Sequence, residues 1–413
     1  MLSAAQSGRF PPVRRDDWLR APEGLAPVER GSVTTPAGFR AAGVACGLKA
    51  SGALDLGILA CDGPATSAMV DTANALPSAP VVRNRRLDRA ALRAVVVNAG
   101  SANAATGSPG VDDADAMARR AAAGLGLLPE QVAVCSTGTI GDRLDLGLVG
   151  PGIDAAAAAL GGDGGPDFGH AICTTDRAPK GGAFRLALGS GEVLIGAAAK
   201  GAGMIAPHMA TMLAYATVGA AVGAADLQEM TAAAAEASFN RISVDGQMSP
   251  SDTLLVLARG TGAPLAGADR DRLAEGLAAV CRWLALQMLR DGEGAEHAVR
   301  VLVQGARDPL EAERVARAVA DSPLVKTAMF GRDPNWGRIT QAAGAALIGA
   351  PGEVPEPAIF VDEVPYASEA ALEVLARQEY DLRIDLGRGD AAAELWGCDL
   401  GHEYVRINAE YHT

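Results

Sequence analysis

Lys200-Gly-Ala-Gly-Met-Ile-Ala-Pro-His-Met-Ala-Thr211-Met-Leu213 joins a lysine, a glycine-rich turn and a threonine that opens an apolar run. No charged residue occurs from Gly201 to Ala225, and this length would suffice to span a bilayer. Glycines and Pro207 interrupt the segment too often for a stable membrane helix. We therefore expect a buried loop that leads into a core strand.

The same stretch admits two chemical interpretations. A glycine-rich turn beside a lysine can cradle phosphate, but here Lys200 precedes the glycines, whereas a Walker loop places its lysine after them. Alternatively, the turn positions the Thr211 hydroxyl at the start of a strand. A hydroxyl in such a place is usually structural, so the segment alone does not establish a catalytic role.

Hydrophobic periodicity around this segment indicates an α/β body. Five short apolar runs read as buried strands: 54–61, 92–98, 131–135, 184–188 and 193–199. Ala-rich segments at 113–125 and 225–238 predict helices. The longest expected helix covers 269–289, where apolar residues recur at three- and four-residue steps and therefore share one face: Leu273, Leu277, Val280, Cys281, Leu284 and Met288. We interpret that stripe as core.

After about residue 300, the pattern of apolar and charged residues changes. Valines alternate with other residues over 299–303, a helix is expected over 309–321, and residues 380–386 alternate strictly between apolar and charged. Val405, Ile407 and Ala409 repeat the alternation and predict a last strand. We divide the chain into a loose N-terminal extension (1–27), a main α/β body (28–300) and a smaller C-terminal α/β unit (301–413).

Composition excludes several classes of function. A net charge of −13 disfavours a polyanionic partner, and 4% aromatic residues do not suit a stacking surface for nucleic acid. No secretory signal is recognisable at the N-terminus. The six cysteines form no CxxC pair, so a disulfide framework, a zinc site and a thiol nucleophile are all less favoured than buried free thiols. We expect a cytoplasmic protein with no membrane or nucleic-acid partner.

Several motifs in order resemble one family. Besides the stretch above, they are Val97-Asn-Ala-Gly-Ser-Ala-Asn-Ala-Ala-Thr-Gly107, Cys135-Ser-Thr-Gly-Thr-Ile-Gly141, Thr174-Thr-Asp176, Val325-Lys-Thr-Ala-Met-Phe-Gly-Arg-Asp-Pro-Asn-Trp-Gly-Arg338, Trp396-Gly-Cys-Asp-Leu400 and Tyr404-Val-Arg-Ile-Asn-Ala-Glu-Tyr-His-Thr413. Together they resemble the ornithine acetyltransferase family, also called the bifunctional glutamate N-acetyltransferase family of arginine biosynthesis. The likeness runs from about residue 30 to the end.

The resemblance implies a layered αββα sandwich and a self-cleaving nucleophile. Thr211 matches the family's nucleophile, and cleavage of the Ala210–Thr211 bond would give fragments 1–210 and 211–413. The α-amine freed on Thr211 has a reference pKa of about 8, so it can act as a base for its own hydroxyl. Gly201 and Gly203 would let the backbone approach closely. Thr137 and Gly138 match the family's oxyanion hole.

The resemblance also implies the substrates and their contacts. The acetyl group would pass from N2-acetylornithine to Thr211 and then to glutamate; direct use of acetyl-CoA is left open. Contacts carry over to Thr174, with Thr175 as the alternative, and to Lys200, Glu293, Asn408 and Thr413. Lys200 suits an α-carboxylate and Glu293 suits the ornithine ammonium. No metal or organic cofactor is implied, and His208 and His402 lack metal spacing. The family's fragments assemble as a heterotetramer.

Three departures from the family pattern keep alternatives open. Ala295-Glu296-His297 stands where the family usually has Ala-Thr-Lys, Ser249-Pro-Ser-Asp-Thr253 where it has Ser-Thr-Asn-Asp-Thr, and Val70-Asp-Thr-Ala-Asn74 reduces an early Phe-Thr-x-Asn block. One alternative keeps the nucleophile but changes the acceptor to another amine or to water. The other is a relative that neither cleaves nor catalyses.

Overall fold

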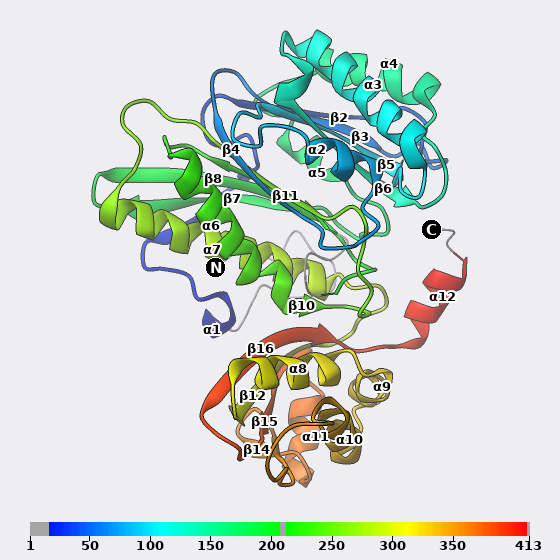
Figure 1. Cartoon of the computed structure of the whole chain (residues 1–413), viewed down its shortest axis with the longest axis vertical. Coiled ribbons are helices and arrows are strands. Elements are labelled where there is room, and N and C mark those ends of the chain that lie inside the picture. The colour runs from blue at the N-terminus through cyan, green and yellow to red at the C-terminus, as the bar shows by residue number, and fades with distance from the viewer. Residues whose placement is uncertain (1–15, 207–211, 411–413) are drawn as a thin grey trace.

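Two β-sheets stacked face to face form the main body (Figure 1). The computed structural model describes residues 16–206 and 212–410. The first sheet has the strand order β1 (Leu25–Val28), β7 (Lys180–Leu188), β8 (Gly191–Lys200), β9 (Leu213–Val218), β11 (Thr253–Ala258) and β4 (Thr66–Asp71). The second has the order β2 (Phe39–Val44), β3 (Leu56–Cys61), β5 (Ala94–Ser101) and β6 (Val132–Thr139).

Side chains that alternate along each strand fill the space between the sheets and the space outside them. In β3, Leu59 faces the first sheet and packs with Tyr215 and Leu255, whereas Ile58 faces the helices. Every residue of β3 is buried because both faces are covered. The short helix α5 (Gly165–Ala171) packs against β2 and β3, and its Phe168 joins the inner core.

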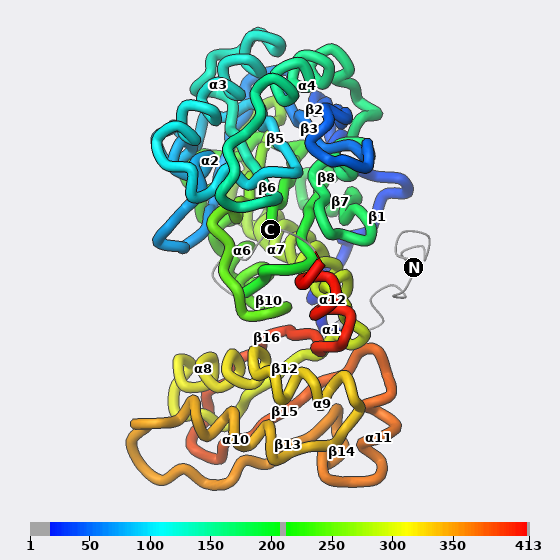
Figure 2. The backbone as a smooth tube through the Cα atoms, turned by 90° about the vertical axis from the view of Figure 1, so that its right-hand side faces the viewer, coloured from blue at the N-terminus to red at the C-terminus, as the bar shows by residue number. Residues whose placement is uncertain are grey.

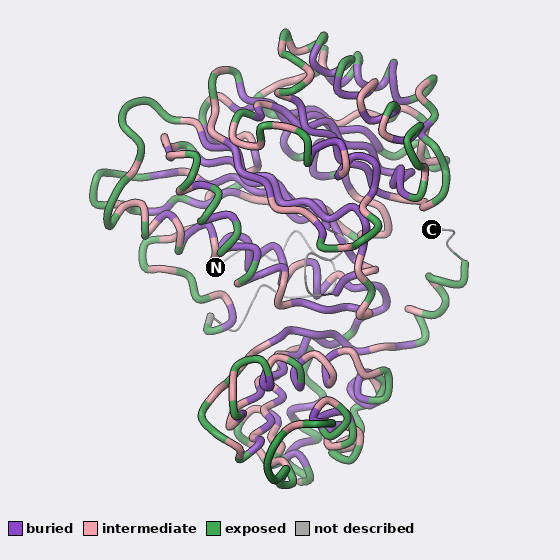
Figure 3. Tube along the Cα trace, viewed as in Figure 1, coloured by how far each residue is buried: buried purple, intermediate pink, exposed green. Residues whose placement is uncertain are grey.

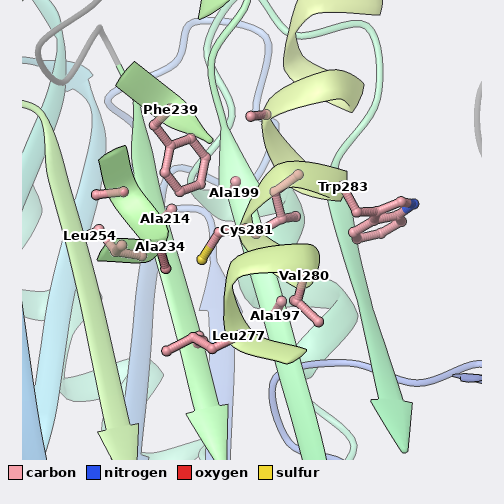
Figure 4. Packing of buried hydrophobic residues seen from close by; sticks show 14 of the residues in the cluster. Ala197, Ala199, Ala214, Ala234, Phe239, Leu254, Leu277, Val280, Cys281 and Trp283 are labelled. Carbon is pink, nitrogen blue, oxygen red and sulfur yellow. The ribbon is translucent and has the colours of Figure 1, made fainter. Parts of the chain in front are cut away.

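Two pairs of helices cover the outer faces of the sheets. Helices α3 (Gly107–Leu125) and α4 (Leu146–Ala158) cover the second sheet. Helices α6 (Ala224–Glu236) and α7 (Gly267–Arg290) cover the first, with the α7 residues Leu277 and Cys281 packed onto Ala197 and Ala214 (Figure 4). The order helix, sheet, sheet, helix is the αββα sandwich that the resemblance implied, and the apolar stripe of α7 is core.

A third sheet builds the C-terminal part of the molecule. Its order is β10 (Ile242–Ser243), β16 (Ala391–Cys398), β12 (Ala298–Ala306), β15 (Glu379–Asp385), β13 (Ala358–Val361) and β14 (Val364–Pro365). The helices beside it are α8 (Pro309–Ala320), α9 (Pro323–Gly331), α10 (Trp336–Ala346) and α11 (Glu369–Leu375). The alternation predicted for 299–303 and 380–386 is present: Val301 and Leu382 are fully buried beneath the helices, whereas Asp381 is half-buried on the other face.

The two parts of the molecule share a sheet at their junction. β10 lies between α6 and β11 in the chain, yet it pairs in parallel with β16, with Ile242 opposite Trp396. Trp396 and Cys398 belong to the same buried cluster as α7. The junction therefore combines a short backbone pairing with an apolar contact. Figure 2 shows β10 and β16 next to each other where the two parts meet.

The described part of the expected N-terminal extension is packed rather than loose. Residues 16–27 include the helix α1 (Asp16–Leu19) and most of β1, an edge strand paired with β7. Trp18 is fully buried, and its indole N–H donates to Asp381 Oδ1 at 2.9 Å. Burial of a tryptophan whose N–H is hydrogen-bonded stabilises the packing of this segment, although most of the residues around it are polar.

The last predicted strand is wrong, because residues 402–410 form the helix α12 (His402–Glu410). None of its residues is buried, and Figure 3 shows the helix in the colours of exposed and intermediate residues. Val405 is 63% exposed. Alternation of apolar and polar residues indicates a strand only where one face of the segment is buried. Over 405–409 neither face is buried, so the alternation was not informative. Helix α12 follows β16 directly and lies beside the junction of the two parts (Figure 1).

Within the uncharged segment Gly201 to Ala225, residues 201–206 are in a loop and residues 213–218 form the core strand β9, as the sequence predicted, whereas residues 207–211 lie outside the described part. All six residues of β9 are buried. Within residues 16–206 and 212–410, no helix is long and apolar enough to cross a membrane.

Candidate active site

A cavity of about 940 Å³ opens where the two stacked sheets, the loops at their ends and α12 meet. Residues singled out from the sequence line it, among them Thr137, Gly138, Thr174 with its alternative Thr175, Lys200, Glu293 and Asn408. They come from β6, β8, α12 and two loops, so the fold joins positions that are as much as 271 residues apart, from 137 to 408. Ala210, Thr211 and Thr413 lie outside the described residues.

Thr137 and Lys200 form a buried polar pair in the lining of the cavity. Thr137 is 4% exposed and Lys200 is 2% exposed, and Lys200 Nζ donates to Thr137 Oγ1 at 3.3 Å. An ammonium group has only donors, so the threonine oxygen must accept this hydrogen bond. The hydroxyl proton of Thr137 is consequently left to donate elsewhere.

Gly138 occupies a position that only glycine can fill. Its φ is +128°, and a Cβ there would lie 2.4 Å from the carbonyl carbon of Gly100. The ladder between β5 and β6 is irregular at this point, because Ser101 pairs with both Thr137 and Thr139. An irregularity of this kind turns backbone groups away from regular pairing. It places the backbone of Gly138 in the cavity wall beside the Thr137 hydroxyl.

The segment that carries Thr211 connects two adjacent antiparallel strands. Lys200 at the end of β8 pairs with Leu213 at the start of β9. The chain re-enters the described structure at Met212, whose N–H donates to Asp252 Oδ1 at 2.9 Å. Burial raises the pKa of Asp252 well above its ordinary value. Residue 211 is thus attached to a strand end that is fixed by a buried carboxyl group.

Glu293 supplies a carboxylate on one side of the cavity. It is 7% exposed, and Asn408 Nδ2 from α12 donates to its Oε2 at 2.7 Å. The carboxylate lies against Gly203, where a Cβ would come within 2.5 Å of Glu293 Cδ. Gly203 therefore gives Glu293 room, a role different from the backbone freedom near the cleavage site that the sequence suggested.

A buried charge cluster, missed by the sequence analysis, holds the loops that carry these residues. Lys180 forms ion pairs with both Asp176 and Asp291, and its side chain is 5% exposed. Asp176 also accepts from the N–H of Gly201 at 2.7 Å and of Thr174 at 2.9 Å. Burial alone would raise the pKa of Asp176, but the positive charges of Lys180 and Lys200 lower it.

Asp291 completes this cluster on the Glu293 side. Its Oδ2 accepts from the N–H of Arg177 at 3.0 Å as well as from Lys180, and burial raises its pKa. The loops at 174–177 and 291–293 are therefore tied to one ammonium group. The only sequence signal was the acidic residue in Thr174-Thr-Asp176, followed four positions later by a lysine.

Asp245 joins α12 to the loop that follows β8. It accepts from the N–H of Met204 at 2.7 Å and of Ile205 at 2.9 Å, and the Tyr404 hydroxyl donates to it at 3.2 Å. Burial raises the pKa of Asp245. Together with the Asn408–Glu293 bond, this contact fixes α12 over the cavity although the helix buries none of its own residues.

The departures from the family pattern fall in different places. Ser249, Pro250 and Ser251 line the cavity. Glu296 is exposed and outside the lining, and His297 is buried with its Nδ1 2.8 Å from Asp399 Oδ2. All six cysteines are free thiols.

Comparison with known proteins gives a consistent match over nearly the whole chain. The ArgJ family model matches residues 40–413. The arginine biosynthesis bifunctional protein ArgJ of Symbiobacterium thermophilum is 46% identical over 399 residues, covering 93% of this chain and 99% of that protein. The protein of the same name from Bacillus subtilis is 40% identical over 402 residues, covering 93% of this chain and 97% of that protein.

Among solved structures, the ornithine acetyltransferase of Mycobacterium tuberculosis complexed with ornithine is 41% identical to this chain. The alignment covers 46% of this chain and 100% of that one, with a TM-score of 0.42. The family model and relatives that are at least 40% identical over 93% of the chain agree on the family. The chain belongs to the ArgJ family.

Proposed function

We propose that this protein transfers an acetyl group from N2-acetylornithine to glutamate through an acyl-threonine intermediate on Thr211, as part of arginine biosynthesis. The proposal rests chiefly on the buried Lys200–Thr137 pair, which faces the same cavity as Glu293 in a chain of the ArgJ family. The curated relatives are named bifunctional arginine-biosynthesis proteins, which supports this activity.

The first step is self-cleavage between Ala210 and Thr211, which produces fragments 1–210 and 211–413. The new α-amine of Thr211 then accepts the proton of its own hydroxyl as that oxygen attacks the acetyl carbonyl. The amide C–N bond breaks, ornithine leaves with the proton, and an acetyl ester remains on Thr211. The amine of glutamate attacks the ester and restores the threonine hydroxyl.

Thr137 and Gly138 would stabilise the oxyanion formed in both steps. Because the oxygen of Thr137 accepts from Lys200, its proton is free to donate to the developing negative charge. The Gly138 N–H would supply the second donor. Lys200 also adds positive charge close to the oxyanion, in a site where little water screens it.

Thr174, Lys200, Glu293, Asn408 and Thr413 would bind the amino-acid part of the substrates. Lys200 and the Thr174 hydroxyl suit an α-carboxylate, whereas Glu293 suits the side-chain ammonium of ornithine. Asn408 already holds one oxygen of Glu293, so the carboxylate presents its remaining acceptor sites in a fixed direction. Acetyl-CoA would be a second donor for glutamate. We further propose a cytoplasmic heterotetramer of the two fragments.

Intact-mass measurement combined with an acetyl-transfer assay tests this function. The wild type should give two fragments that break before Thr211 and should acetylate glutamate at the expense of N2-acetylornithine. Thr211→Ala should remain a single polypeptide without transfer activity. An uncut wild type, or transfer by Thr211→Ala, would contradict the proposal; water or another amine as the better acceptor would contradict only the choice of glutamate.

The oxyanion role has its own test in Thr137→Ala. Loss of one oxyanion donor in other enzymes lowers kcat by about 10² to 10³, and we expect a loss of that size. The variant must be assayed after cleavage is verified by mass, because the same donor would assist self-cleavage. A loss of less than about fivefold in fully cleaved protein would remove Thr137 from this role.

A further inference from the structure

One carboxyl oxygen of Asp252 has a hydrogen-bond partner and the other does not. The side chain is fully buried and stands directly before β11. Its Oδ1 accepts from the N–H of Met212 at 2.9 Å, whereas its Oδ2 has no partner among the residues that the structure describes. Buried polar atoms are seldom left unpaired in folded proteins, so this oxygen requires an explanation.

The hydroxyl group of Thr72, close to this carboxyl group, is directed elsewhere. The N–H of Thr72 donates to the backbone carbonyl of Asp252 at 3.0 Å, which places the two residues side by side. The Thr72 Oγ1 nevertheless donates to the carbonyl of Ser249 at 2.7 Å and accepts from the N–H of Asn74 at 3.1 Å. A hydroxyl group has a single proton, so Thr72 has none left to give to Asp252 Oδ2.

The charged groups on the strands around Asp252 are also engaged. At the end of β8, Lys200 lowers the pKa of Asp252, although burial raises it by more, and Lys200 Nζ donates to Thr137 at 3.3 Å. At the end of β4, Asp71 forms ion pairs with two arginines. The start of β9 carries no titratable side chain. The carboxyl group of Asp252 therefore has no ion-pair partner on these three strands.

The group that Oδ2 can reach is the nitrogen of residue 211. Thr211 lies outside the described residues, but only two backbone carbons separate its nitrogen from that of Met212, so the two nitrogens are no more than about 3.7 Å apart. The backbone of Met212 is fixed on both sides, because its carbonyl accepts from the N–H of Thr253 at 3.0 Å. A carboxyl group that binds one nitrogen through Oδ1 can bind a second through Oδ2, as bidentate carboxylates do.

We propose that Asp252 is a positioning residue for the base of the reaction: after self-cleavage, its Oδ2 accepts a hydrogen bond from the α-amine of Thr211. Its charge stabilises the ammonium that forms when this amine takes the proton of the Thr211 hydroxyl. This inference rests on the proposed function. It adds no bond to the acyl transfer: the proton moves from the hydroxyl to the amine and then to the departing ornithine, while Asp252 stays a carboxylate.

The surroundings of the amine make such a partner necessary. Cleavage leaves the nitrogen of Thr211 with one covalent bond to carbon in place of two, so a hydrogen bond is needed to keep its direction. Lys200 lies opposite Leu213 across the sheet, and its positive charge makes a neighbouring amine a weaker base. A buried carboxylate counters this effect, as it does for the histidine of Ser-His-Asp triads.

Asp252→Asn separates this role from the fixing of Met212. The amide oxygen can still accept from the Met212 N–H, but the NH2 group that replaces Oδ2 cannot accept from an amine. We expect kcat for transfer from N2-acetylornithine to glutamate to fall by at least about tenfold, because the ammonium loses its partner. KM should change by less than about threefold.

The pH profile gives a readout that a merely structural role would not move. The acidic limb of kcat/KM for N2-acetylornithine reports the base of the free enzyme. In Asp252→Asn this limb should move to lower pH by about one unit or more, because loss of a neighbouring carboxylate lowers the pKa of the Thr211 amine. Both proteins are assayed after intact mass has verified cleavage and circular dichroism has verified folding.

Asp71→Asn is the matched control. Asp71 is a buried carboxylate opposite Thr253 on the neighbouring strand, and it pairs with Arg85 and Arg89, which follow α2 (Ala79–Asn84). Its replacement should lower stability and leave both kcat and the acidic limb unchanged.

Three results with Asp252→Asn would overturn the inference. They are a wild-type kcat, a reduced kcat with an unshifted acidic limb, and a folded variant that stays uncut, which would assign Asp252 to self-cleavage instead. An uncut or inactive wild type would refute the proposed function itself.

A second measurement leaves Asp252 in place, and it decides the matter if Asp252→Asn does not fold. In the uncut chain, burial raises the pKa of Asp252 and favours the protonated carboxyl group. In the cleaved protein, the ammonium of Thr211 should lower this pKa. The infrared C=O band of protonated carboxyl groups at neutral pH should therefore be weaker in the cleaved wild type than in uncut Thr211→Ala. Bands of equal strength would contradict the proposed contact.

Discussion

Gly203 shows how one missing side chain can set a substrate preference. The Glu293 carboxylate occupies the space where a Cβ on residue 203 would lie, within 2.5 Å of its Cδ. Any larger residue at 203 must push the carboxylate away from its contact with Asn408. The proposed partner of the ornithine ammonium therefore depends on a glycine in another loop.

Gly203→Ala should raise KM for N2-acetylornithine by at least about tenfold, because a charged contact displaced from its partner is worth roughly 1.5–3 kcal/mol. Self-cleavage and stability should change little, since the far end of a side chain can shift. Gly331→Ala is the control, because a Cβ there meets nothing within 4 Å. Equal KM values for the two variants would show that Glu293 does not bind this substrate.

Asp252 makes stability depend on pH in a defined direction. Burial raises its pKa well above the value of about 3.9 expected for the unfolded chain. Between those two values the folded protein binds more protons than the unfolded chain. The contribution of this residue to stability is therefore fully present below pH 4 and is lost as pH rises toward the folded-state pKa.

Asp252→Asn should remove this loss while keeping an oxygen to accept from Met212. The free energy of unfolding, measured in urea in the Thr211→Ala background so that the chain stays uncut, should shift in favour of the variant as pH increases from 4 to 8. The slope of the difference should approach about 1.4 kcal/mol per pH unit in the titrating window. Parallel curves for the two proteins would show that Asp252 is ionised in the folded state.

At the scale of elements, the Lys180 cluster connects segments that secondary structure does not join. Lys180 begins β7, yet its partners lie in the loop before that strand and in the loop after α7. The strands and helices fix where each loop starts. The ion pairs fix how the loops that carry Thr174 and Glu293 stand relative to one another.

Lys180→Met should destabilise the protein by about 3–5 kcal/mol, because it leaves two carboxylates close together in a buried site. Arg185→Met, in the same strand, removes an exposed pair with Glu192 at 3.9 Å, with both side chains 53% exposed, and should change stability by less than about 1 kcal/mol. Urea unfolding of both variants in the Thr211→Ala background checks the contrast. Similar losses in both would mean that the cluster has no special role.

Elements with strong periodicity were predictable from the sequence, and weakly buried ones were not. The stripe of α7 and the alternation of β12 and β15 reflect burial on one face, so they identified both the element and its orientation. Helix α12 buries nothing of its own, and its alternating apolar residues misled the prediction. Trp18 was missed because a single buried aromatic leaves no periodic signal.

Only those residues of the candidate site that lie in recognisable sequence motifs could be predicted. The motif resemblance named Thr137, Gly138, Thr174, Lys200, Glu293 and Asn408, which the fold brings to one cavity. Asp176, Lys180 and Asp291 were not identified because their effect depends on distances between loops far apart in the chain.

At the scale of the whole molecule, the proposed cleavage would divide a sheet whose strands are interleaved. In the first sheet, β9 and β11 come from fragment 211–413, and they lie between β8 and β4 of fragment 1–210 (Figure 1). Each fragment therefore pairs with the other on two sides. The cluster between the two stacked sheets draws on both fragments, so neither fragment can complete that core alone.

The cleaved protein should accordingly elute as one species in size-exclusion chromatography and separate into two chains only in denaturant. Mass spectrometry under native and denaturing conditions measures both states directly. The same elution volume is expected for the uncut Thr211→Ala variant. Separation of the fragments in native buffer would contradict the shared sheet.

The pairing of β10 with β16 constrains how ligands reach the cavity. Rotation of the C-terminal part away from the sandwich would separate β10 from β16 at the edge of the sheet and expose Trp396 and Cys398 to water. A clam-like opening would therefore lose both this backbone pairing and the burial of these side chains. Ligand entry is therefore expected without separation of the two parts, through the opening that the sheet ends, their loops and α12 surround.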